Sequence, residues 1–247
     1  MSESEASPGA TPTLVIIPAF NEEAALPAVL RELATRPGLD VIVVDDGSTD
    51  RTAAVAAAEG VTVLSLPFNL GIGGALRTGF LYAVRNGYDR AVQFDGDGQH
   101  DPDEIATLLA ALDDGADMVV GSRFAGKATS YTVSRVRARA MGVLRFTIKT
   151  LSGQQFSDTS SGFRGFNREV LEFFARTYPA EYMESVEALL LACAEGFRVT
   201  EVPVNMSDRE AGTPSNRRLR LVYHYLRLMV VLVASAPRRA VVREARA

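Results

Sequence analysis

Short apolar runs recur along the first half of the chain. They occupy residues 14–18, 41–44, 61–66, 90–94 and 117–121, are rich in Val, Ile and Leu, and show little polar alternation. Runs of this kind are typical of strands that are buried on both faces of a parallel sheet. The pattern therefore predicts five strands between residues 14 and 121.

The segments between these runs carry helix signals. Apolar residues recur at helical spacing over residues 26–33, and an alanine-rich stretch reaches Gly60, with Ser48 or Thr49 predicted to cap its start. Two more helices are expected over residues 73–86 and 102–113. Because strand and helix alternate with short links, the sequence predicts an α/β fold, a mostly parallel doubly wound sheet flanked by helices.

The alternation ends after Arg123. The second half of the chain is expected to be an elaboration of the first, nucleotide-binding half, and to bind a second substrate, the acceptor. There the sequence indicates helices at residues 134–150 and 183–194, an irregular Ser- and Gly-containing segment at residues 156–166, and one more strand at residues 198–206. The predicted organisation is a disordered tail (1–12), a domain (13–212) with donor half 13–123 and acceptor half 124–212, and a basic amphipathic C-terminal helix and tail (213–247).

Polar clusters directly follow three of the predicted strands, at residues 19–23, 45–50 and 95–101. The carboxyl ends of parallel strands meet at one edge of a sheet, where ligands bind, so we expect these clusters to converge. Asp95 and Asp97 place two carboxylates at i and i+2, which suits Mg²⁺ or Mn²⁺ with a substrate diphosphate. The alternative interpretation of this string is an acidic surface turn.

Charge is distributed unevenly although the net charge is only −4. No acidic residue lies between Asp117 and Asp158, and residues 209–247 hold nine arginines against two glutamates. This asymmetry favours an anionic partner, either a phosphate-bearing substrate or an acidic membrane face, while no motif supports nucleic acid. The single cysteine, Cys193, excludes an internal disulfide and fits a reducing cytoplasm.

The C-terminal segment predicts a helix with one polar side. Residues 219–236 are mostly apolar, but Arg220, His224 and Arg227 recur at helical spacing, and the uninterrupted apolar part is too short to span a bilayer. Two interpretations stand side by side: a helix in the membrane interface, and a helix docked on the core or in a homo-oligomer interface.

Four short motifs follow one another along the first half: PAFNEE at 18–23, VDDGSTD at 44–50, NLGIGGA at 69–75 and DGDGQH at 95–100. In this order they closely resemble the family-two inverting glycosyltransferases, which implies the nucleotide-sugar-binding GT-A fold. The second half adds GSRF at 121–124, SGFR at 161–164, VE at 186–187, EVPV at 201–204 and DR at 208–209. These motifs resemble the branch of dolichol- and polyprenyl-phosphate mannose synthases.

The resemblance implies roles for the matched residues of the donor half. Base and ribose of a GDP- or UDP-hexose are expected at the first two loops, residues 19–23 and 45–50. The diphosphate is expected at Mg²⁺ or Mn²⁺ on the acidic loop, residues 95–101. The expected donor-binding residues are Pro18, Phe20, Glu22, Asp46, Gly71, Gly74 and Asp95, and the expected metal ligands are Asp95, Asp97 and Gln99. His100 is expected to hydrogen-bond locally rather than to bind the metal.

A polyprenyl phosphate acceptor is expected to need arginines more than a general base, because a phosphate monoester is already largely ionised at neutral pH. The acceptor-phosphate candidates are Arg123, Arg135, Arg139, Ser161 and Arg164, and the residues expected to carry catalysis are Asp97, Arg123, Arg164 and Glu187. Should the acceptor be a hydroxyl, Asp158, Glu184 and Glu187 are candidate bases.

One departure from the synthases concerns the acceptor end of the sequence. Their Asp-Arg…Gly segment often continues into Ser-Lys, whereas residues 212–216 read GTPSN here. The sequence thus predicts a metal-dependent hexosyltransferase acting on polyprenyl phosphate, peripheral at the cytoplasmic membrane face. The alternatives are a glycan, lipid or small-molecule hydroxyl acceptor, a sugar nucleotidyltransferase, and a non-catalytic nucleotide-sugar-binding or membrane-adaptor protein.

Overall fold

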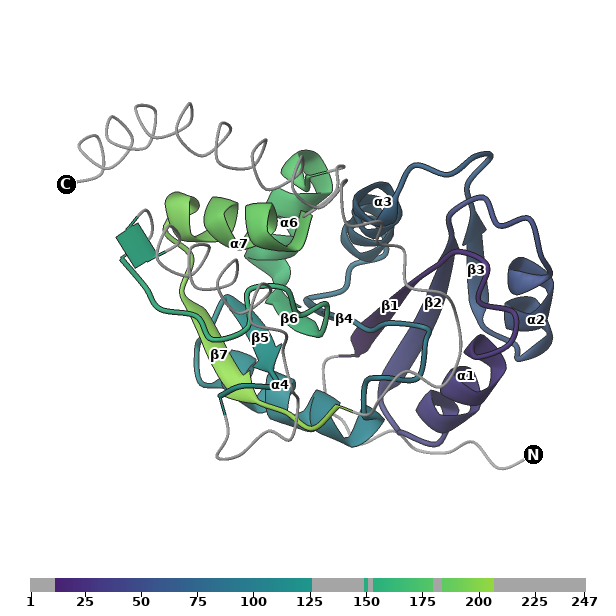
Figure 1. Ribbon diagram of the computed structural model, residues 1–247, viewed down its shortest axis with the longest axis horizontal. Helices are drawn as coiled ribbons and strands as arrows, with labels where there is room; N and C mark the ends of the chain where they lie inside the picture. Colours follow the sequence, from purple (N-terminus) through teal and green to yellow (C-terminus); the bar gives the residue numbers. More distant parts are fainter. Residues whose placement is uncertain (1–11, 126–148, 151–152, 180–183, 207–247) are drawn as a thin grey trace, which may run out of the picture.

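A computed structural model describes residues 12–125, 149–150, 153–179 and 184–206. Among these residues the chain forms one sheet with helices on both faces (Figure 1). The strands are β1 (Thr13–Ala19), β2 (Leu39–Asp45), β3 (Thr62–Ser65), β4 (Arg90–Gln93), β5 (Met118–Ser122), β6 (Arg164–Asn167) and β7 (Val199–Pro203). The helices are α1 (Leu26–Ala34), α2 (Thr52–Ala58), α3 (Ile72–Arg85), the 3₁₀ turn η1 (Pro102–Glu104), α4 (Ile105–Asp113), α6 (Arg168–Thr177) and α7 (Glu184–Glu195).

The sheet has the strand order β3-β2-β1-β4-β6-β5-β7. Every neighbouring pair is parallel except β4–β6 and β5–β6, so β6 is the one antiparallel strand in the described part of the chain. The prediction of a mostly parallel α/β sheet is therefore confirmed. The strand β6 was not predicted, because it lies in the Ser- and Gly-containing segment that the sequence marked as irregular.

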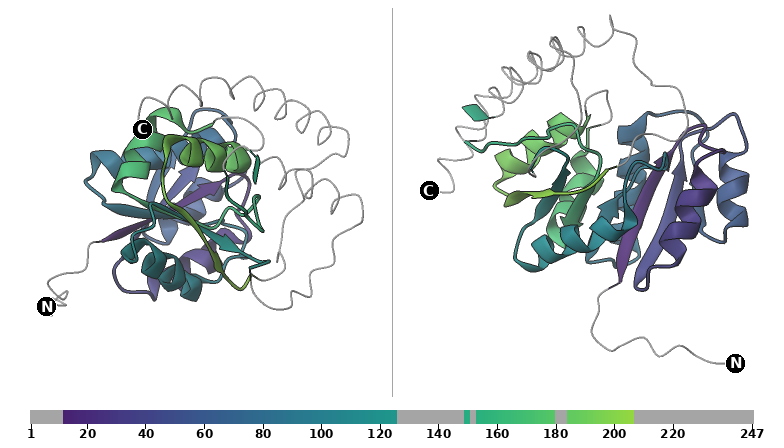
Figure 2. Two further views of the ribbon diagram at one scale, coloured as in Figure 1. Left: turned by 90° about the vertical axis from the view of Figure 1, so that its left-hand side faces the viewer. Right: turned by 60° about the horizontal axis from the view of Figure 1, so that its bottom comes forward.

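Two apolar layers enclose the sheet. One packs α3, α6 and α7 against strand residues such as Ile16 and Val120, and the other packs α1, α2 and α4 against residues such as Ile17 and Val119. Figure 2 shows the helices on the two sides of the sheet. Because both faces are covered, β1 and β5 are buried along almost their whole length, as their apolar runs predicted.

The predicted cap of α2 is wrong. The helix begins at Thr52 and has no side-chain cap at its N-cap residue, Arg51. The hydroxyl of Ser48 instead accepts a hydrogen bond from the backbone N–H of Asn21 (3.0 Å), because the first two loops bind each other. The backbone N–H of Thr52 donates to Asp50 Oδ1 (2.9 Å).

Three predicted segments fall wholly or mainly outside the described residues. They are the tail (1–12, described only at residue 12), the basic helix (134–150, described only at residues 149–150) and the C-terminal segment (213–247). Their predicted structure and their part in the domain boundaries stay predictions. No helix in the described ranges is long and apolar enough to cross a membrane.

Candidate active site

The loops after β1 and β2 are tied together at the carboxyl edge of the sheet. Asn21, which has a positive φ of 56°, accepts the backbone N–H of Thr49 on its side-chain oxygen (2.9 Å). The backbone N–H of Glu22 donates to the hydroxyl of Thr52 (2.9 Å), and Phe20 is 43% exposed. The first loop therefore stands at a fixed place on the rim, with an aromatic ring open to a ligand.

Asp46 connects the second loop to the third. Its side chain is buried, and Oδ1 accepts the backbone N–H of Leu70 (2.7 Å). Burial raises the pKa of Asp46, and the backbone N–H groups of Leu70 and Gly71 oppose that shift. Asp46 thus holds the loop that leads into α3, and its predicted contact with the nucleotide stays a proposal.

The glycines of the third loop have packing reasons. Gly71, directly before α3, has a φ of +83°, a conformation that L side chains rarely adopt. A Cβ on Gly74 would lie 2.5 Å from Cβ of Leu70, so a side chain there would displace the loop. These glycines keep the loop close to the N-terminus of α3, which is compatible with a nearby diphosphate.

The acidic loop after β4 is held by internal hydrogen bonds. Asp97 is 4% exposed, and its Oδ1 accepts the backbone N–H of Gln99 (3.1 Å). The backbone N–H of Asp95 donates to Nδ1 of His100 (3.0 Å), and Nε2 of His100 lies 3.5 Å from Asp95 Oδ2. The expectation that His100 bonds locally is confirmed, and its ring also stacks on Phe163 (4.7 Å between centroids).

Burial lowers the pKa of His100 to about 4, opposed by the charge of Asp97 and assisted by the charge of Arg123. The imidazole is therefore neutral at physiological pH. Arg123 directly follows β5, and its charge acts on His100 of the acidic loop. The ends of β4 and β5 lie at the same edge of the sheet, with β6 between them.

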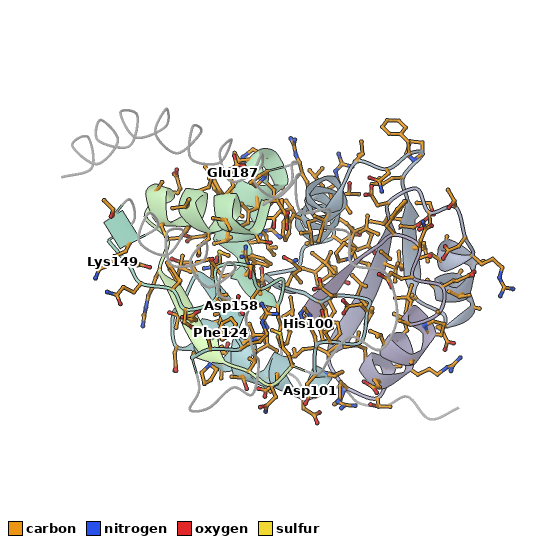
Figure 3. All side chains as sticks on the ribbon, in the orientation of Figure 1. His100, Asp101, Phe124, Lys149, Asp158 and Glu187 are labelled. Carbon is orange, nitrogen blue, oxygen red and sulfur yellow. The ribbon has the colours of Figure 1, made fainter. Side chains whose placement is uncertain are left out.

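Arg123 is paired with a carboxylate of the second half. Its Nε donates to Asp158 Oδ2 (2.8 Å) and its Nη2 to Asp158 Oδ1 (3.2 Å). Asp158 is fully buried, and the Arg123 side chain is 22% exposed. Figure 3 labels Asp158, Phe124 and His100 in the middle part of the molecule, and Glu187 of α7.

The other acceptor candidates lie deeper. Arg164 is fully buried at the start of β6, with Nε donating to the carbonyl of Ser161 (2.8 Å), and Ser161 is 2% exposed. Arg135 and Arg139 lie outside the described residues. Burial raises the pKa of Glu184 and of Glu187, and for Glu187 the charge of Glu184 adds to the shift.

Sequence reasoning singled out Arg164 but missed two other buried polar side chains, Gln93 and Tyr178. Gln93 faces Arg164 across the β4–β6 pair. Within the described ranges both amide atoms of Gln93, Nη1 of Arg164 and the hydroxyl of Tyr178 are buried without a hydrogen-bond partner. The signal for Gln93 was present, since it is a polar residue inside an apolar run.

The acidic loop offers side-chain oxygens of the type that suits a divalent cation, and its metal site stays a prediction. In the part of the chain that the structure describes, no three His, Cys, Asp or Glu side chains gather into a metal-binding cluster. Two carboxylates and the amide of Gln99 leave coordination positions for a donor diphosphate and water, the arrangement in which Mg²⁺ is usually bound. The donor set is all oxygen, which Mg²⁺ and Mn²⁺ prefer.

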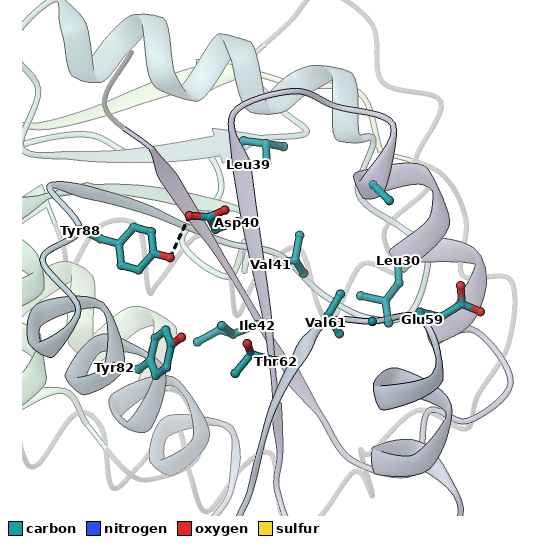
Figure 4. Close-up of a pocket in the computed structure, with 12 residues that line it drawn as sticks. Leu30, Leu39, Asp40, Val41, Ile42, Glu59, Val61, Thr62, Tyr82 and Tyr88 are labelled. Carbon is teal, nitrogen blue, oxygen red and sulfur yellow. Dashed lines mark hydrogen bonds between the residues drawn. The ribbon is translucent and has the colours of Figure 1, made fainter. Parts of the chain in front are cut away.

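A separate pocket lies at the beginning of β2, away from the rim (Figure 4). The hydroxyl of Tyr88 donates to Asp40 Oδ2 there (2.9 Å). Burial, followed by this bond, raises the pKa of Tyr88 to about 12. None of the residues predicted to bind donor, acceptor or metal lines this pocket.

The sequence profile of Glycosyl transferase family 2 matches residues 14–174. Polyprenol monophosphomannose synthase of Mycolicibacterium smegmatis is 35% identical over 215 residues, covering 81% of this chain and 79% of the relative. Undecaprenyl-phosphate mannosyltransferase of Micrococcus luteus is 35% identical over 213 residues, covering 81% and 85%.

Among solved structures, glucosyl-3-phosphoglycerate synthase of Mycobacterium tuberculosis, in complex with Mn²⁺, uridine-diphosphate-glucose and phosphoglyceric acid, superposes with a TM-score of 0.69. The match covers 92% of this chain and 79% of that chain at 22% identity, so it establishes the fold, which is GT-A. The predicted fold and family are both confirmed. The family match and the two relatives show that this chain belongs to glycosyl transferase family 2 and is a glycosyltransferase.

Proposed function

We propose that the chain transfers a hexose, mannose or glucose, from a GDP- or UDP-linked donor to polyprenyl phosphate at the cytoplasmic membrane face. The observation that carries this proposal is that the acidic loop, which follows β4, and Arg123, which follows β5 and pairs with Asp158, lie at the same edge of the sheet. Carboxylates suit the cation of the donor diphosphate, and a guanidinium suits an acceptor phosphate. Both named relatives carry a prenol or prenyl phosphate in their names.

The donor half would hold the nucleotide sugar. Base and ribose lie against the first two loops, at Pro18, Phe20, Glu22 and Asp46, and the diphosphate lies between Gly71, Gly74 and the acidic loop. Asp95, Asp97 and Gln99 would hold Mg²⁺ or Mn²⁺, and the bound ion would neutralise charge that builds on the departing nucleoside diphosphate.

The acceptor phosphate would be held by Arg123, with Ser161 and Arg164 below it and with Arg135 and Arg139 from the segment that is not described. A phosphate oxygen attacks the anomeric carbon in line, the bond to the nucleoside diphosphate breaks, and the configuration inverts. No proton has to be removed from a phosphate that is ionised at neutral pH. Glu187 would act on this side of the site by orienting an arginine.

A hydroxyl acceptor is the second candidate. Its supporting observation is the raised pKa of Glu184 and Glu187, since burial makes each carboxylate a stronger base. Glu184 is 7% exposed and accepts a hydrogen bond from the hydroxyl of Ser185 (2.6 Å), which limits its reach. We therefore favour the phosphate acceptor.

A donor panel tests the proposal. The purified chain would be incubated with GDP-mannose, UDP-glucose and other nucleotide sugars, with polyprenyl phosphate vesicles and Mn²⁺ or Mg²⁺, and lipid-linked sugar would be extracted. We expect one hexose donor to give product that depends on both the metal and the lipid phosphate. Product from no donor, or equal product without polyprenyl phosphate, would contradict the proposal.

A further inference from the structure

Asp158 is a carboxylate with no exposed surface at the junction between the two halves of the sheet. Both of its oxygens accept from Arg123, at 2.8 and 3.2 Å, and Oδ1 also accepts from the backbone N–H and hydroxyl of Ser160 (3.3 and 3.1 Å). Burying a carboxylate is costly unless it is paired and hydrogen-bonded. This two-point pairing therefore fixes the plane of the Arg123 guanidinium.

A second carboxylate fixes the backbone on which Asp158 stands. Glu201 lies on β7, opposite Val120 of β5. Its Oε1 accepts the backbone N–H of Asp158 (2.7 Å), and its Oε2 accepts the backbone N–H of Ser157 (2.8 Å). Backbone N–H groups bound by a carboxylate form charge-assisted hydrogen bonds, which are stronger than neutral ones.

The same loop is tied to β5 directly. The hydroxyls of Ser122 and Ser157 are 2.7 Å apart, and Ser122 immediately precedes Arg123. The hydroxyl of Ser122 also accepts the backbone N–H of Phe124 (3.1 Å). Both ends of the Arg123–Asp158 pair are therefore held to neighbouring strands, β5 and β7.

We propose that Asp158 and Glu201 are positioning residues, which orient the Arg123 guanidinium for the acceptor phosphate. Glu201 binds the backbone of residues 157–158, and the Asp158 side chain in turn binds Arg123. This inference rests on the proposed function, and it assigns to Asp158 a role other than general base. A guanidinium binds phosphate best in a fixed bidentate geometry, so an arginine that is oriented beforehand loses less conformational freedom on binding.

Binding and kinetics of Asp158→Asn and Glu201→Gln test the inference, because both variants keep the shape and remove the charge. Titration calorimetry with farnesyl phosphate, in the presence of nucleoside diphosphate and Mn²⁺, should give binding at least about tenfold weaker for Asp158→Asn. Glu201→Gln, which leaves the Arg123–Asp158 pair intact, should lose about threefold. Nucleoside diphosphate affinity of Glu201→Gln should match wild type, while the loss of one of its two backbone hydrogen bonds should lower the thermal unfolding midpoint by about 4 °C.

Glu59→Gln is the matched control. Glu59 also accepts Nε and Nη2 of an arginine, Arg31, at 3.2 and 2.6 Å, but on the far side of the donor half. That variant should leave farnesyl phosphate binding unchanged. A loss equal to that of Asp158→Asn would mean that the assay measures general stability, and it would overturn the inference.

A double-mutant cycle separates positioning from a direct role. In an Arg123→Ala background, Asp158→Asn should weaken farnesyl phosphate binding by less than about twofold further, because its effect passes through the missing guanidinium. A full additional loss in that background, or an equal loss of nucleoside diphosphate binding, would overturn the inference.

Failure of the proposed function would look different. A wild-type chain that binds farnesyl phosphate but transfers no hexose would contradict the function, while the binding data on the variants would still decide the positioning role. A wild-type chain that does not bind the probe would overturn both proposals.

Discussion

The donor half and the acceptor half of the chain hold their polar groups in different ways. In the donor half, loop residues such as Asn21 and Ser48 bind one another through single hydrogen bonds near the surface. Both halves bury carboxylates, Asp46 and Asp97 in the donor half and Asp158 in the acceptor half, but Asp158 is engaged by a two-point ion pair with Arg123.

This difference follows from what each side is proposed to bind. A nucleotide presents many neutral donors and acceptors, which surface loops meet with hydrogen bonds and an open aromatic ring such as Phe20. A phosphate presents concentrated charge, which needs a cation held in place by buried partners. We infer that both sides are held in place before a ligand binds, the donor side by hydrogen bonds between its loops and the acceptor side by a buried ion pair.

The largest effect is expected at the acidic loop, where the two sides meet. Asp97→Asn should lower the rate of hexose transfer about a thousandfold with Mn²⁺, because loss of a charged ligand removes several kcal/mol of charge stabilisation. Removing divalent ions from the wild-type enzyme with a chelator should have a similar effect. Initial rates of lipid-linked product formation measure both.

Asp101→Asn is the control for that change. Asp101 lies in the same loop and caps η1 by accepting the backbone N–H of Asp103 (2.9 Å), a role that asparagine fills equally well. Its rate should stay near wild type. Full activity in Asp97→Asn would show that the loop holds no essential ion.

An effect of intermediate size, on the metal requirement, is expected where Gly162 of the acceptor half contacts Asp95 of the donor half. A Cβ on Gly162 would lie 2.9 Å from Asp95 Oδ2 and 3.1 Å from its Oδ1. Gly162→Ala should therefore displace that carboxylate and raise the Mn²⁺ concentration for half-maximal rate by about tenfold.

Gly165→Ala is matched to it, because the added Cβ would meet Cδ1 of Leu112 at 3.3 Å, the end of a flexible side chain. Its metal requirement should stay unchanged. If both variants behave alike, Asp95 does not depend on the second half, and the two sides are more independent than proposed.

The smallest effect is expected at the outer end of the donor half. The folded-state pKa of Tyr88 is about 12, above its ordinary value of 10, so its contribution to stability is complete below pH 10 and is lost as the pH rises towards 12. Tyr88→Phe should lower the free energy of unfolding by less than about 1 kcal/mol at pH 8. Its stability should then fall less between pH 10 and 12.

Urea unfolding at several pH values measures this difference. Tyr82→Phe, whose ring stacks on Tyr88 at 6.5 Å, is the control and should stay close to the wild-type curve, because the charge of Tyr82 makes the smallest contribution to the raised pKa of Tyr88. A Tyr88→Phe curve as steep as wild type above pH 10 would exclude the Tyr88–Asp40 bond as the source.

The donor half could be predicted because its signals are local. The apolar runs around Ile16 and Val43 contain the information for buried parallel strands, and the polar residues that follow them must then share one edge. The loop contacts were not predictable in this way, since Ser48 bonds to Asn21, 27 residues away, rather than capping its own helix.

The acceptor half was predicted less well because its order is non-local. The short strand β6 joins β4 and β5 although about 40 residues of chain separate Ser122 from Arg164. Arg123 and Asp158 are 35 residues apart, and nothing in the sequence between them indicates a pair. The backbone N–H of Asp158 is in turn bound by Glu201, which comes from yet another strand.

The choice of acceptor tests the central claim most directly. Polyprenyl phosphate and the matching polyprenol, which lacks only the phosphate, would be offered to the enzyme with the productive nucleotide sugar and Mn²⁺. The anomeric configuration of any product would be determined by NMR. We predict product from polyprenyl phosphate alone, with the configuration inverted relative to the donor. Transfer to polyprenol at a comparable rate, or retention of configuration, would contradict the account.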